Sequence, residues 1–510
     1  MSQSVQSSGG TITKKKLRRR KFREPQQAWK KLRSIFRPLE EQNYMKYRRV
    51  LGFGGFGIVQ LWDINNEKGE RARSVAIKTP IKPDDNGNDL KREIWWTKRF
   101  TGSEHLVQLV DLGEKARGIV DYNNENSTGP PIMVMEELGQ GSLDLMMSRI
   151  KYMKAINHTL PENERALEYI PNTILWSIFL CLTRACIGMA YPPVSPESGQ
   201  GASNRETMSG APPIQDSNYV HNDIDVGNIF VANPIDHPRD NEHPWAPIVK
   251  IADYGCMVQW DDNWGIDQKM SSLWGKPAYK APEQLGTRAL RRGAVGTHTN
   301  VYQIGQVMHD LITLERIPYG DRAKLIRELP DGADMDTYGW RLLDFEGYYK
   351  IEEDWANVDF ELRTLAAGCM ADLELERPPL GHLEHIILNR LSNIYQQAND
   401  ARQGLNPPPA ESVPGQPSPA AGPDLYKNRV PMWEVEPDTI LNSFCKDYFE
   451  STWGDTDRYR EFWSKPTVPT KSPTQPLQPG KAQSLNRLLE TRQRLEGSGS
   501  PISYVQHGDN

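Results

Sequence analysis

Residues 219–231 read YVHNDIDVGNIFV and hold the most informative pattern in this chain of 510 residues. Asp223 is followed five positions later by Asn228, and an apolar run comes directly after the pair. Two further motifs follow in order, Asp253-Tyr254-Gly255 and Ala281-Pro282-Glu283. A short Asp-x-x-x-x-Asn pattern alone would be weak, but unrelated sequences rarely reproduce several spaced motifs in one order.

This ordered set resembles the catalytic loop, the metal-binding Asp and the end of the activation segment of eukaryotic protein kinases. The resemblance implies an α+β, bilobed fold, with a small antiparallel β-sheet lobe plus one helix, a larger and mainly helical lobe, and disordered tails. It also implies in-line transfer of the γ-phosphoryl group of Mg-ATP to a hydroxyl of a protein substrate. In that mechanism Asp223 orients the hydroxyl and accepts its proton, and Asn228 and Asp253 hold Mg²⁺.

A glycine-rich stretch upstream fits the same family. Residues 52–59 read GFGGFGIV, in which Gly52, Gly54, Gly55 and Gly57 would let the backbone approach the phosphates of ATP closely. A dinucleotide-binding fingerprint would open a helix and carry an acidic residue about 20 positions later. Here a second strand follows instead, so the kinase interpretation is favoured.

A strand that resembles the third strand of the kinases ends in Val75-Ala76-Ile77-Lys78. The resemblance places Lys78 to reach the α- and β-phosphates. Glu93, in a charged segment that follows, fits the helix-borne Glu that pairs with this Lys. Solvated surface charge is the ordinary alternative for both residues. The position of Lys78 at the end of an apolar strand, inside a matched motif, favours the functional interpretation. For Glu93 the assignment is less specific, because neighbouring charged residues could occupy the same position in another register.

Residues 131–139 resemble the fifth strand and the hinge between the lobes. In that register Met135 is the gatekeeper, and backbone groups of Glu136 and Leu138 face adenine. Val59, Ala76 and Phe230 would sandwich the adenine ring. Ordinary strand core is the alternative for these apolar residues, and both interpretations are compatible because nucleotide pockets are mostly apolar.

Several positions depart from the family pattern. Asn222 replaces the Arg that usually receives an activation-loop phosphate, which predicts control without such phosphorylation. Asp225 stands where serine/threonine kinases carry Lys, and Lys276 stands where they carry Thr. We therefore expect the two charges to be exchanged, with Lys276 reaching over Asp225; solvent exposure of both is the alternative. Asn300 replaces an Asp that accepts backbone hydrogen bonds of the catalytic loop, and Thr97 is a polar substitute in an expected apolar spine.

Two functions from different classes remain. The first is an active, divergent protein serine/threonine kinase, favoured by Lys78, Asp223, Asn228 and Asp253. The second is a pseudokinase that serves as an ATP-binding scaffold or interaction protein, favoured by the departures. A small-molecule kinase is disfavoured by Ala281-Pro282-Glu283 and by Arg377, the expected partner of Glu283. The His-x-Asp-x-Asp form resembles divergent kinase-like proteins of filamentous fungi.

The resemblance covers about residues 44–395 and divides the chain into three regions. These are a basic N-terminal arm (1–43), a kinase-like domain with a small lobe (44–139) and a large lobe (140–395), and a Pro-rich linker with a mostly disordered C-terminal tail (396–510). Polar inserts are expected at 115–129, 192–217 and 233–247. The apolar segment 174–191 is interrupted by Arg184 and is too short for a comfortable span of about 20 residues, so it predicts a buried helix and no transmembrane segment.

Composition limits the other possibilities. A net charge of −5 argues against a general nucleic-acid binder. The five cysteines lack metal-ligand spacing and indicate reduced thiols in an intracellular protein, cytoplasmic or nuclear. The basic run Lys14–Arg23 is a candidate for binding a nuclear import receptor, and a solvated arm is its alternative. The aromatic-rich segment 440–463 is an amphipathic docking candidate, either in cis or on a partner.

Overall fold

The structure is a computed structural model. It describes residues 14–54, 57–81, 88–192, 206, 208, 217–232, 242–261, 263–285, 295–317, 324–326, 334–343, 358–403 and 436–450, and only the backbone of residues 14–23 and 324–326. The chain divides into two compact units, Met1–Ser451 and Thr452–Asn510. All described residues belong to the first unit.

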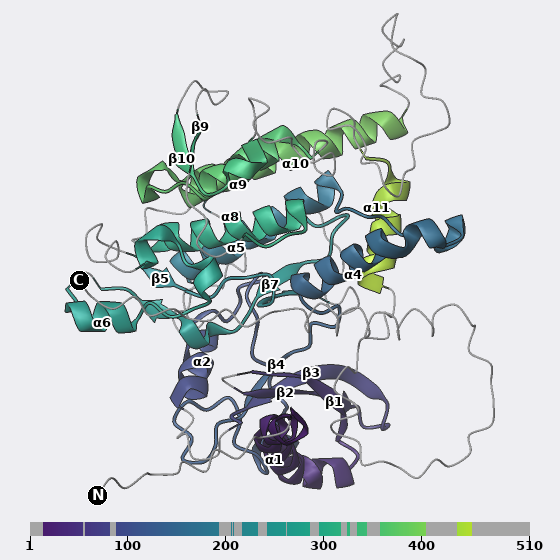
Figure 1. The fold of residues 1–510 in the computed structure, drawn as a ribbon. Helices are drawn as coiled ribbons and strands as arrows, with labels where there is room; N and C mark the ends of the chain where they lie inside the picture. The colour runs from purple at the N-terminus through teal and green to yellow at the C-terminus, as the bar shows by residue number, and fades with distance from the viewer. Residues whose placement is uncertain are drawn as a thin grey trace, which may run out of the picture. The chain divides into compact units, whose positions relative to one another are not determined.

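The small lobe is built on a four-stranded antiparallel sheet in the order β1-β2-β3-β4 (Figure 1). Its strands are β1 (Met45–Phe53), β2 (Ile58–Asn65), β3 (Arg71–Thr79) and β4 (Met133–Glu136). The helices of this lobe are α2 (Asn88–Arg99) and the one-turn α3 (Glu114–Arg117). The predicted α+β fold is therefore confirmed, although this lobe holds more than the one helix that was predicted. The strand expected before the insert at 115 is reduced to an isolated bridge between Leu109 and Met135.

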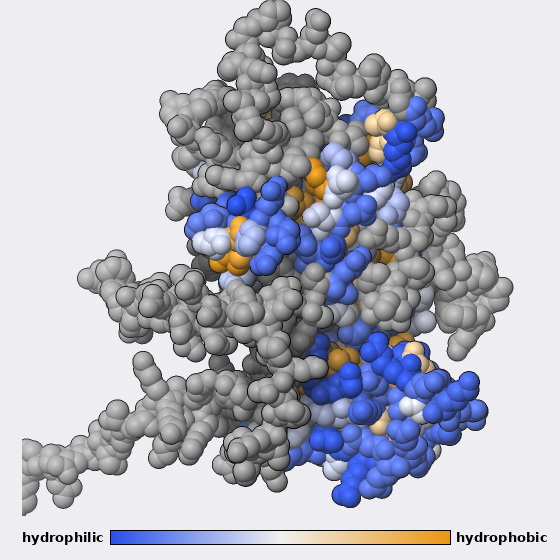
Figure 2. Space-filling view, turned by 90° about the vertical axis from the view of Figure 1, so that its right-hand side faces the viewer, coloured by the Kyte–Doolittle hydropathy of each residue, from blue (hydrophilic) through white to orange (hydrophobic). Residues whose placement is uncertain are grey.

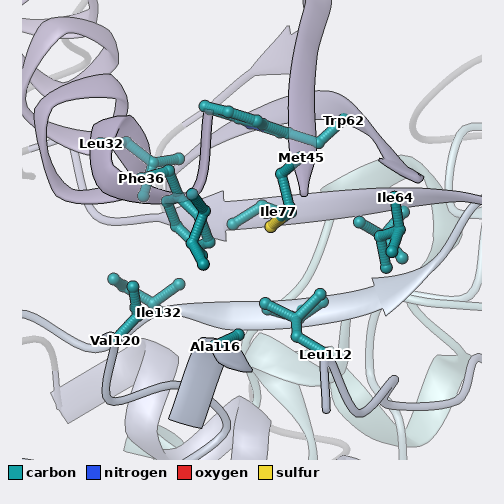
Figure 3. Close-up of a cluster of buried hydrophobic side chains, with 13 residues drawn as sticks. Leu32, Phe36, Met45, Trp62, Ile64, Ile77, Leu112, Ala116, Val120 and Ile132 are labelled. Atoms are coloured by element: carbon teal, nitrogen blue, oxygen red, sulfur yellow. The ribbon is translucent and has the colours of Figure 1, made fainter. Parts of the chain in front are cut away.

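A long N-terminal helix, α1 (Lys14–Glu41), completes the core of this lobe. Its buried residues Ala28, Leu32, Phe36 and Leu39 recur every three or four positions, so they form one apolar face. Figure 3 shows Leu32 and Phe36 beside Ile77 of the sheet, in a single cluster that also includes Trp62 and Met45. The sequence predicted an arm that ends at residue 43, whereas the structure makes this helix part of the small-lobe core.

The insert at 115–129 is also part of that core. Ala116 and Val120 are buried in the same cluster, on its side away from α1 (Figure 3). Asn123, with φ 52°, donates to the carbonyl of Val110 and accepts from the amide of Val134. The polar side chain thus replaces backbone pairing that a longer strand would supply.

The large lobe is mainly helical (Figure 1). Its α-helices are α4 (Leu143–Ile156), α5 (Asn172–Ala190), α6 (Ile266–Ser271), α8 (Thr297–Thr313), α9 (Phe360–Cys369), α10 (Leu380–Arg402) and α11 (Asp438–Cys445), and a π-helix, η10 (Lys446–Glu450), continues α11. Its short antiparallel pairs are β5 (Tyr219–Val220) with β8 (Val258–Gln259), β6 (Ile229–Val231) with β7 (Val249–Ile251), and β9 (Lys324–Ile326) with β10 (Met335–Thr337). One-turn 3₁₀ helices punctuate the loops, at Asn157–Thr159, Glu162–Glu164, Tyr254–Cys256 (η4), Pro277–Tyr279, Pro282–Gln284, Trp340–Leu343 and Glu374–Glu376.

Helix α5 forms the centre of this lobe. Every one of its residues is buried, and it packs against α8 and α10. Among the described residues it is the one helix long and apolar enough to cross a membrane by length and composition. Its complete burial inside the protein agrees with the buried helix predicted from the sequence.

The segment 436–450 packs on the large lobe beside α4, although the sequence assigned it to the tail (Figure 1). Phe444, Tyr448 and Phe449 are fully buried. Arg149 of α4 donates to the carbonyl of Tyr448 at 3.1 Å, and the Tyr448 hydroxyl donates to the carbonyl of Leu167. The remainder of the predicted docking segment, 451–463, lies outside the described residues.

On the face drawn in Figure 2, the described residues are mostly hydrophilic, and the apolar ones form small separate groups. Three large apolar side chains in the segment between Asp253 and Glu283 are nevertheless exposed. They are Ile266 (63%), Met270 (42%) and Trp274 (62%).

Candidate active site

The glycine-rich turn joins β1 to β2. The amide of Gly54 donates to the carbonyl of Gly57 at 2.9 Å, which closes the turn; Gly55 lies outside the described residues. A Cβ on Gly57 would lie 2.7 Å from the carbonyl oxygen of Thr79, so a larger residue would push β2 from β3. A Cβ on Gly52 or Gly54 would meet nothing within 4 Å. That open space is what a glycine-rich loop needs if it covers phosphates.

Lys78, Glu93 and Asp253 meet between β3, α2 and the segment after β7. The ammonium of Lys78 donates to both carboxylate oxygens of Glu93, at 2.8 and 2.7 Å, and to Oδ1 of Asp253 at 3.1 Å. Lys78 and Glu93 are buried, whereas the Asp253 side chain is 32% exposed. The structure thus brings together the three charges that the sequence placed far apart.

Lys78 and Asp253 stabilise each other's charge, whereas burial raises the pKa of Glu93 to about 7 despite the opposing charge of Lys78. Burial alone would lower the pKa of Lys78, but the carboxylates of Asp253 and Glu93 outweigh it and raise that pKa. Burial alone would raise the pKa of Asp253, but Lys78 outweighs this effect and the pKa of Asp253 is lowered. Lys78 therefore remains a cation and Asp253 an anion near neutral pH.

The catalytic loop holds Asp223 by both carboxylate oxygens. Oδ1 accepts from the backbone amide of Lys276 at 3.0 Å, and Oδ2 accepts from Nδ2 of Asn228 at 2.9 Å. The same Asn228 nitrogen donates to the carbonyl of Asp223 at 2.8 Å. Asn228 therefore presents its amide oxygen as the atom that it can offer a cation.

Asp225 is 1% exposed and would be a costly buried anion without a partner. Lys276 Nζ donates directly to Asp225 Oδ2, and the amide of Gly227 donates to Asp225 Oδ1 at 2.7 Å. The same ammonium lies 3.8 Å from Asp223 Oδ2. The contact expected from the exchanged charges is present, and the alternative that both side chains face solvent is wrong.

Backbone strain marks the residues beside the site. Asp253 has φ 70° and ψ 68°, a left-handed conformation that non-glycine residues adopt at a cost. Tyr254 behind it packs against Phe100 and His221, and Arg92 of α2 donates to the carbonyl of Gly255 at 2.6 Å. Burial lowers the pKa of His221 to about 4, so its ring is a neutral packing group at pH 7.

Asn222 ties the catalytic loop to the following segment without any phosphate. Its φ is 67°, and its side chain is fully buried. Nδ2 donates to the carbonyls of Cys256 at 3.0 Å and Ser272 at 3.3 Å, and Oδ1 accepts from Nε2 of Gln284 at 2.7 Å. The sequence showed the missing Arg but gave no sign of Gln284 as the replacement partner.

Two further pairs fix the large lobe. Arg377 makes a buried bidentate ion pair with Glu283 at 2.7 and 2.8 Å, as the sequence register predicted. Asn300 accepts from the amide of His221 at 3.0 Å, and its Nδ2 donates to the carbonyl of Tyr219 at 2.8 Å. The amide side chain thus uses both of its ends. The Thr97 hydroxyl is satisfied within α2 by the carbonyl of Glu93.

The expected adenine site is lined by apolar groups on both lobes. Ala76 is paired with Met135 across β3 and β4 in the small lobe, and Phe230 belongs to β6 in the large lobe. Val59 and Leu138 are partly exposed, as a ligand-facing residue would be. The side chain of Glu136 binds Lys250 at 2.9 and 3.0 Å, a contact between hinge and large lobe that the sequence did not indicate.

A family model described as "Protein tyrosine and serine/threonine kinase" matches residues 45–338. The chain belongs to this family. The match begins with β1 and includes the glycine-rich turn, the Lys78 triad, the catalytic loop and the Glu283 segment. The match confirms the protein kinase superfamily inferred from the ordered motifs. The family includes kinases that phosphorylate tyrosine and kinases that phosphorylate serine or threonine.

Proposed function

We propose that this protein is a serine/threonine protein kinase that transfers the γ-phosphoryl group of Mg-ATP to a protein hydroxyl. The observation that carries the proposal is the joint placement of Lys78, Glu93 and Asp253 with the doubly held carboxylate of Asp223. Phosphoryl transfer depends mostly on positioning and electrostatics, and these residues supply both.

The donor set suits the cofactor. The amide oxygen of Asn228 and the carboxylate of Asp253 are hard oxygen ligands, which Mg²⁺ prefers. Bound Mg²⁺ would supply positive charge against the phosphates of ATP. Lys78 and the amides of the 52–57 turn would orient those phosphates, and Asp223 would orient the substrate hydroxyl and take its proton at a carboxylate oxygen.

The choice of serine and threonine rests on the exchanged charges. Lys276 and Asp225 occupy the positions of the family's Thr and Lys, and they are in contact. The cation of the usual serine/threonine arrangement would thereby be kept near Asp223, but supplied by the segment after Asp253 and not by the catalytic loop. The exposed Trp274, two residues before Lys276, offers an apolar side chain to a peptide near Asp223.

The test is ATP-dependent phosphorylation of a degenerate peptide library by the full chain, followed by identification of the phosphorylated residue type. Asp223→Asn should abolish transfer but keep the thermal stabilisation produced by ATP with Mg²⁺, and Asp253→Ala should lose both. Transfer mainly to Tyr would contradict the proposed class.

A second candidate is a pseudokinase that binds nucleotide as a scaffold. The buried acid Asp225 beside the phosphate position favours it, because an anion there repels phosphate. Under this function, ATP with Mg²⁺ would stabilise the wild type while no peptide was phosphorylated. Absence of both effects would contradict both functions.

A further inference from the structure

A buried cluster of metal-ligating side chains lies outside the site described above. His105, Cys181 and His243 are each buried, and one ligand atom of each lies within 4.8 Å of the others. The three come from the loop after α2, from α5 and from the segment before β7. Because up to 138 positions separate the ligands along the chain, no compact cysteine–histidine motif could reveal them.

The two imidazole rings approach each other through their Nε2 atoms. Nε2 of His105 lies 3.2 Å from Nε2 of His243. Two nitrogens bound to one tetrahedral Zn²⁺ are about 3.3 Å apart, given Zn–N bonds of about 2.0–2.1 Å. The distance is thus already that of one edge of a zinc tetrahedron.

The other ring nitrogen of His105 has the partner that metal-bound histidines usually have. Nδ1 of His105 lies 2.5 Å from Oε2 of Glu206, which is itself buried. The backbone amide of His105 also donates to both oxygens of Glu206, at 3.2 Å each. A carboxylate on Nδ1 fixes the tautomer that leaves the Nε2 lone pair for a metal.

From this arrangement we infer that His105, Cys181 and His243 bind Zn²⁺, with Glu206 orienting His105. A thiolate and two imidazoles form a donor set that favours zinc over Mg²⁺ or Ca²⁺. The three leave one tetrahedral position for a water molecule. This site is separate from the Asn228 and Asp253 pair and does not depend on the proposed kinase activity.

The site draws on one described residue from each of two inserts. Glu206 belongs to the insert at 192–217 and His243 to the one at 233–247, and both converge on the same point. The carbonyl of His105 accepts from the amide of Ile251 at 2.9 Å, two residues before Asp253. A metal would therefore join His243 to the loop around His105, which Glu206 also holds and which pairs with β7, the strand before Asp253.

The experiment is metal analysis of the full-length protein, purified without chelators and dialysed. We expect about one zinc per chain, as one tetrahedral site requires, and loss of most of it in Cys181→Ser and in His243→Ala. Cys186→Ser, on the same helix but outside the three ligands, is the matched control and should retain zinc. Zinc kept equally by Cys181→Ser and His243→Ala would overturn the inference.

Two measurements on the wild type remain decisive if those variants fail to fold. Replacing zinc by Co²⁺ should produce visible d–d bands of a tetrahedral ion and a thiolate-to-cobalt charge-transfer band. A zinc-selective chelator, added with excess Mg²⁺, should lower the melting temperature by several degrees. No stoichiometric zinc, no cobalt bands and no chelator effect would mean that the histidines only hydrogen-bond each other.

Discussion

The ammonium of Lys276 donates a hydrogen bond to the buried carboxylate of Asp225. Asp225 is 1% exposed and Lys276 is 46% exposed, so the pair lies at the boundary between the catalytic loop and solvent. Burial raises the pKa of Asp225, and Lys276 opposes that rise. Removing the cation would leave a buried carboxylate without charge compensation, which is more costly than lacking the pair altogether.

We therefore expect Lys276→Thr to reduce kcat/KM by roughly 100-fold, the scale of losing one positioned electrostatic donor. Adding Asp225→Lys rebuilds the usual family arrangement and should recover part of the rate. Kinetics of the two single variants and the double variant measure the coupling. Lys269→Thr, whose ammonium lies over Trp260, is the control and should be near wild type. Additive losses would show that the pair does not act as a unit.

The same lysine should set the acidic limit of activity. Burial raises the pKa of Asp223, whereas the charge and backbone amide of Lys276 lower it. Lys276→Met removes the charge and keeps the amide, so the pKa of Asp223 should rise further. Because the proton acceptor must be ionised, the acidic limb of the kcat/KM profile should move to higher pH. A profile that keeps its acidic midpoint would assign that limb to another group.

Activity should not require phosphorylation between Asp253 and Glu283. Asn222 already joins the catalytic loop to Ser272 and Gln284, and it has no charge with which to bind a phosphate. Ser271→Ala with Ser272→Ala should therefore change activity less than about twofold. Asn222→Ala leaves buried groups unpaired at about 1–3 kcal/mol and should reduce activity by tenfold or more.

Phosphatase treatment of the purified protein supplies the check. Unchanged activity after treatment is the expected result for the wild type. A large loss, reproduced by the double serine variant, would show that a phosphate organises this segment despite Asn222.

Several contacts of the candidate site could be predicted from the sequence, because the residues that make them belong to short local motifs. Lys78 ends a strand of buried residues, and Asp223 and Asn228 lie five positions apart in one loop, so few alternative registers exist. Partners contributed by remote segments were harder to predict. Gln284, which binds Asn222, and Lys250, which binds Glu136, carry no local pattern that identifies them.

The structure also differs from the sequence prediction in where the folded region begins, because helix α1 belongs to the small-lobe core. The spacing of Ala28, Leu32, Phe36 and Leu39 is that of an amphipathic helix, and this signal was present in the sequence. Pro25 and Pro38 lie within the helix and the basic run Lys14–Arg23 forms its start, and both features disfavour an isolated helix. Burial against the sheet outweighs those local preferences, because tertiary packing supplies most helix stability.

Gly275 should be indispensable for the position of Lys276. Its φ is 109°, and a Cβ there would lie 1.9 Å from the carbonyl oxygen of Asn222. Gly275→Ala should therefore displace the catalytic loop and abolish transfer, with a lower melting temperature. Gly265→Ala is the matched control, since its φ is −62° and nothing lies within 4 Å. Similar activity of the two variants would contradict this close approach.

The contact between the 436–450 segment and α5 should contribute measurable stability. Glu436 accepts from the backbone amides of Asn172 at 2.5 Å and Thr173 at 2.8 Å, at the N-terminus of that helix. These amides have no partner within the helix, and the N-terminal end of the helix dipole favours a carboxylate. Glu436→Ala should lower the free energy of unfolding by about 2 kcal/mol, and Glu436→Gln, which keeps an acceptor oxygen, should lower it less.

Asp438→Ala is the matched control for this contact. Asp438 pairs with Arg402 at 2.8 Å, but the two side chains are 41% and 42% exposed, and such surface pairs contribute about 0–1 kcal/mol. Chemical denaturation of the three variants, each with the ATP-induced stabilisation as a second readout, compares the two acids within one segment. Glu436→Ala should be clearly the least stable, because only its loss leaves two buried amides unpaired. Equal stability of Glu436→Ala and Asp438→Ala would show that this segment leaves the large lobe in solution.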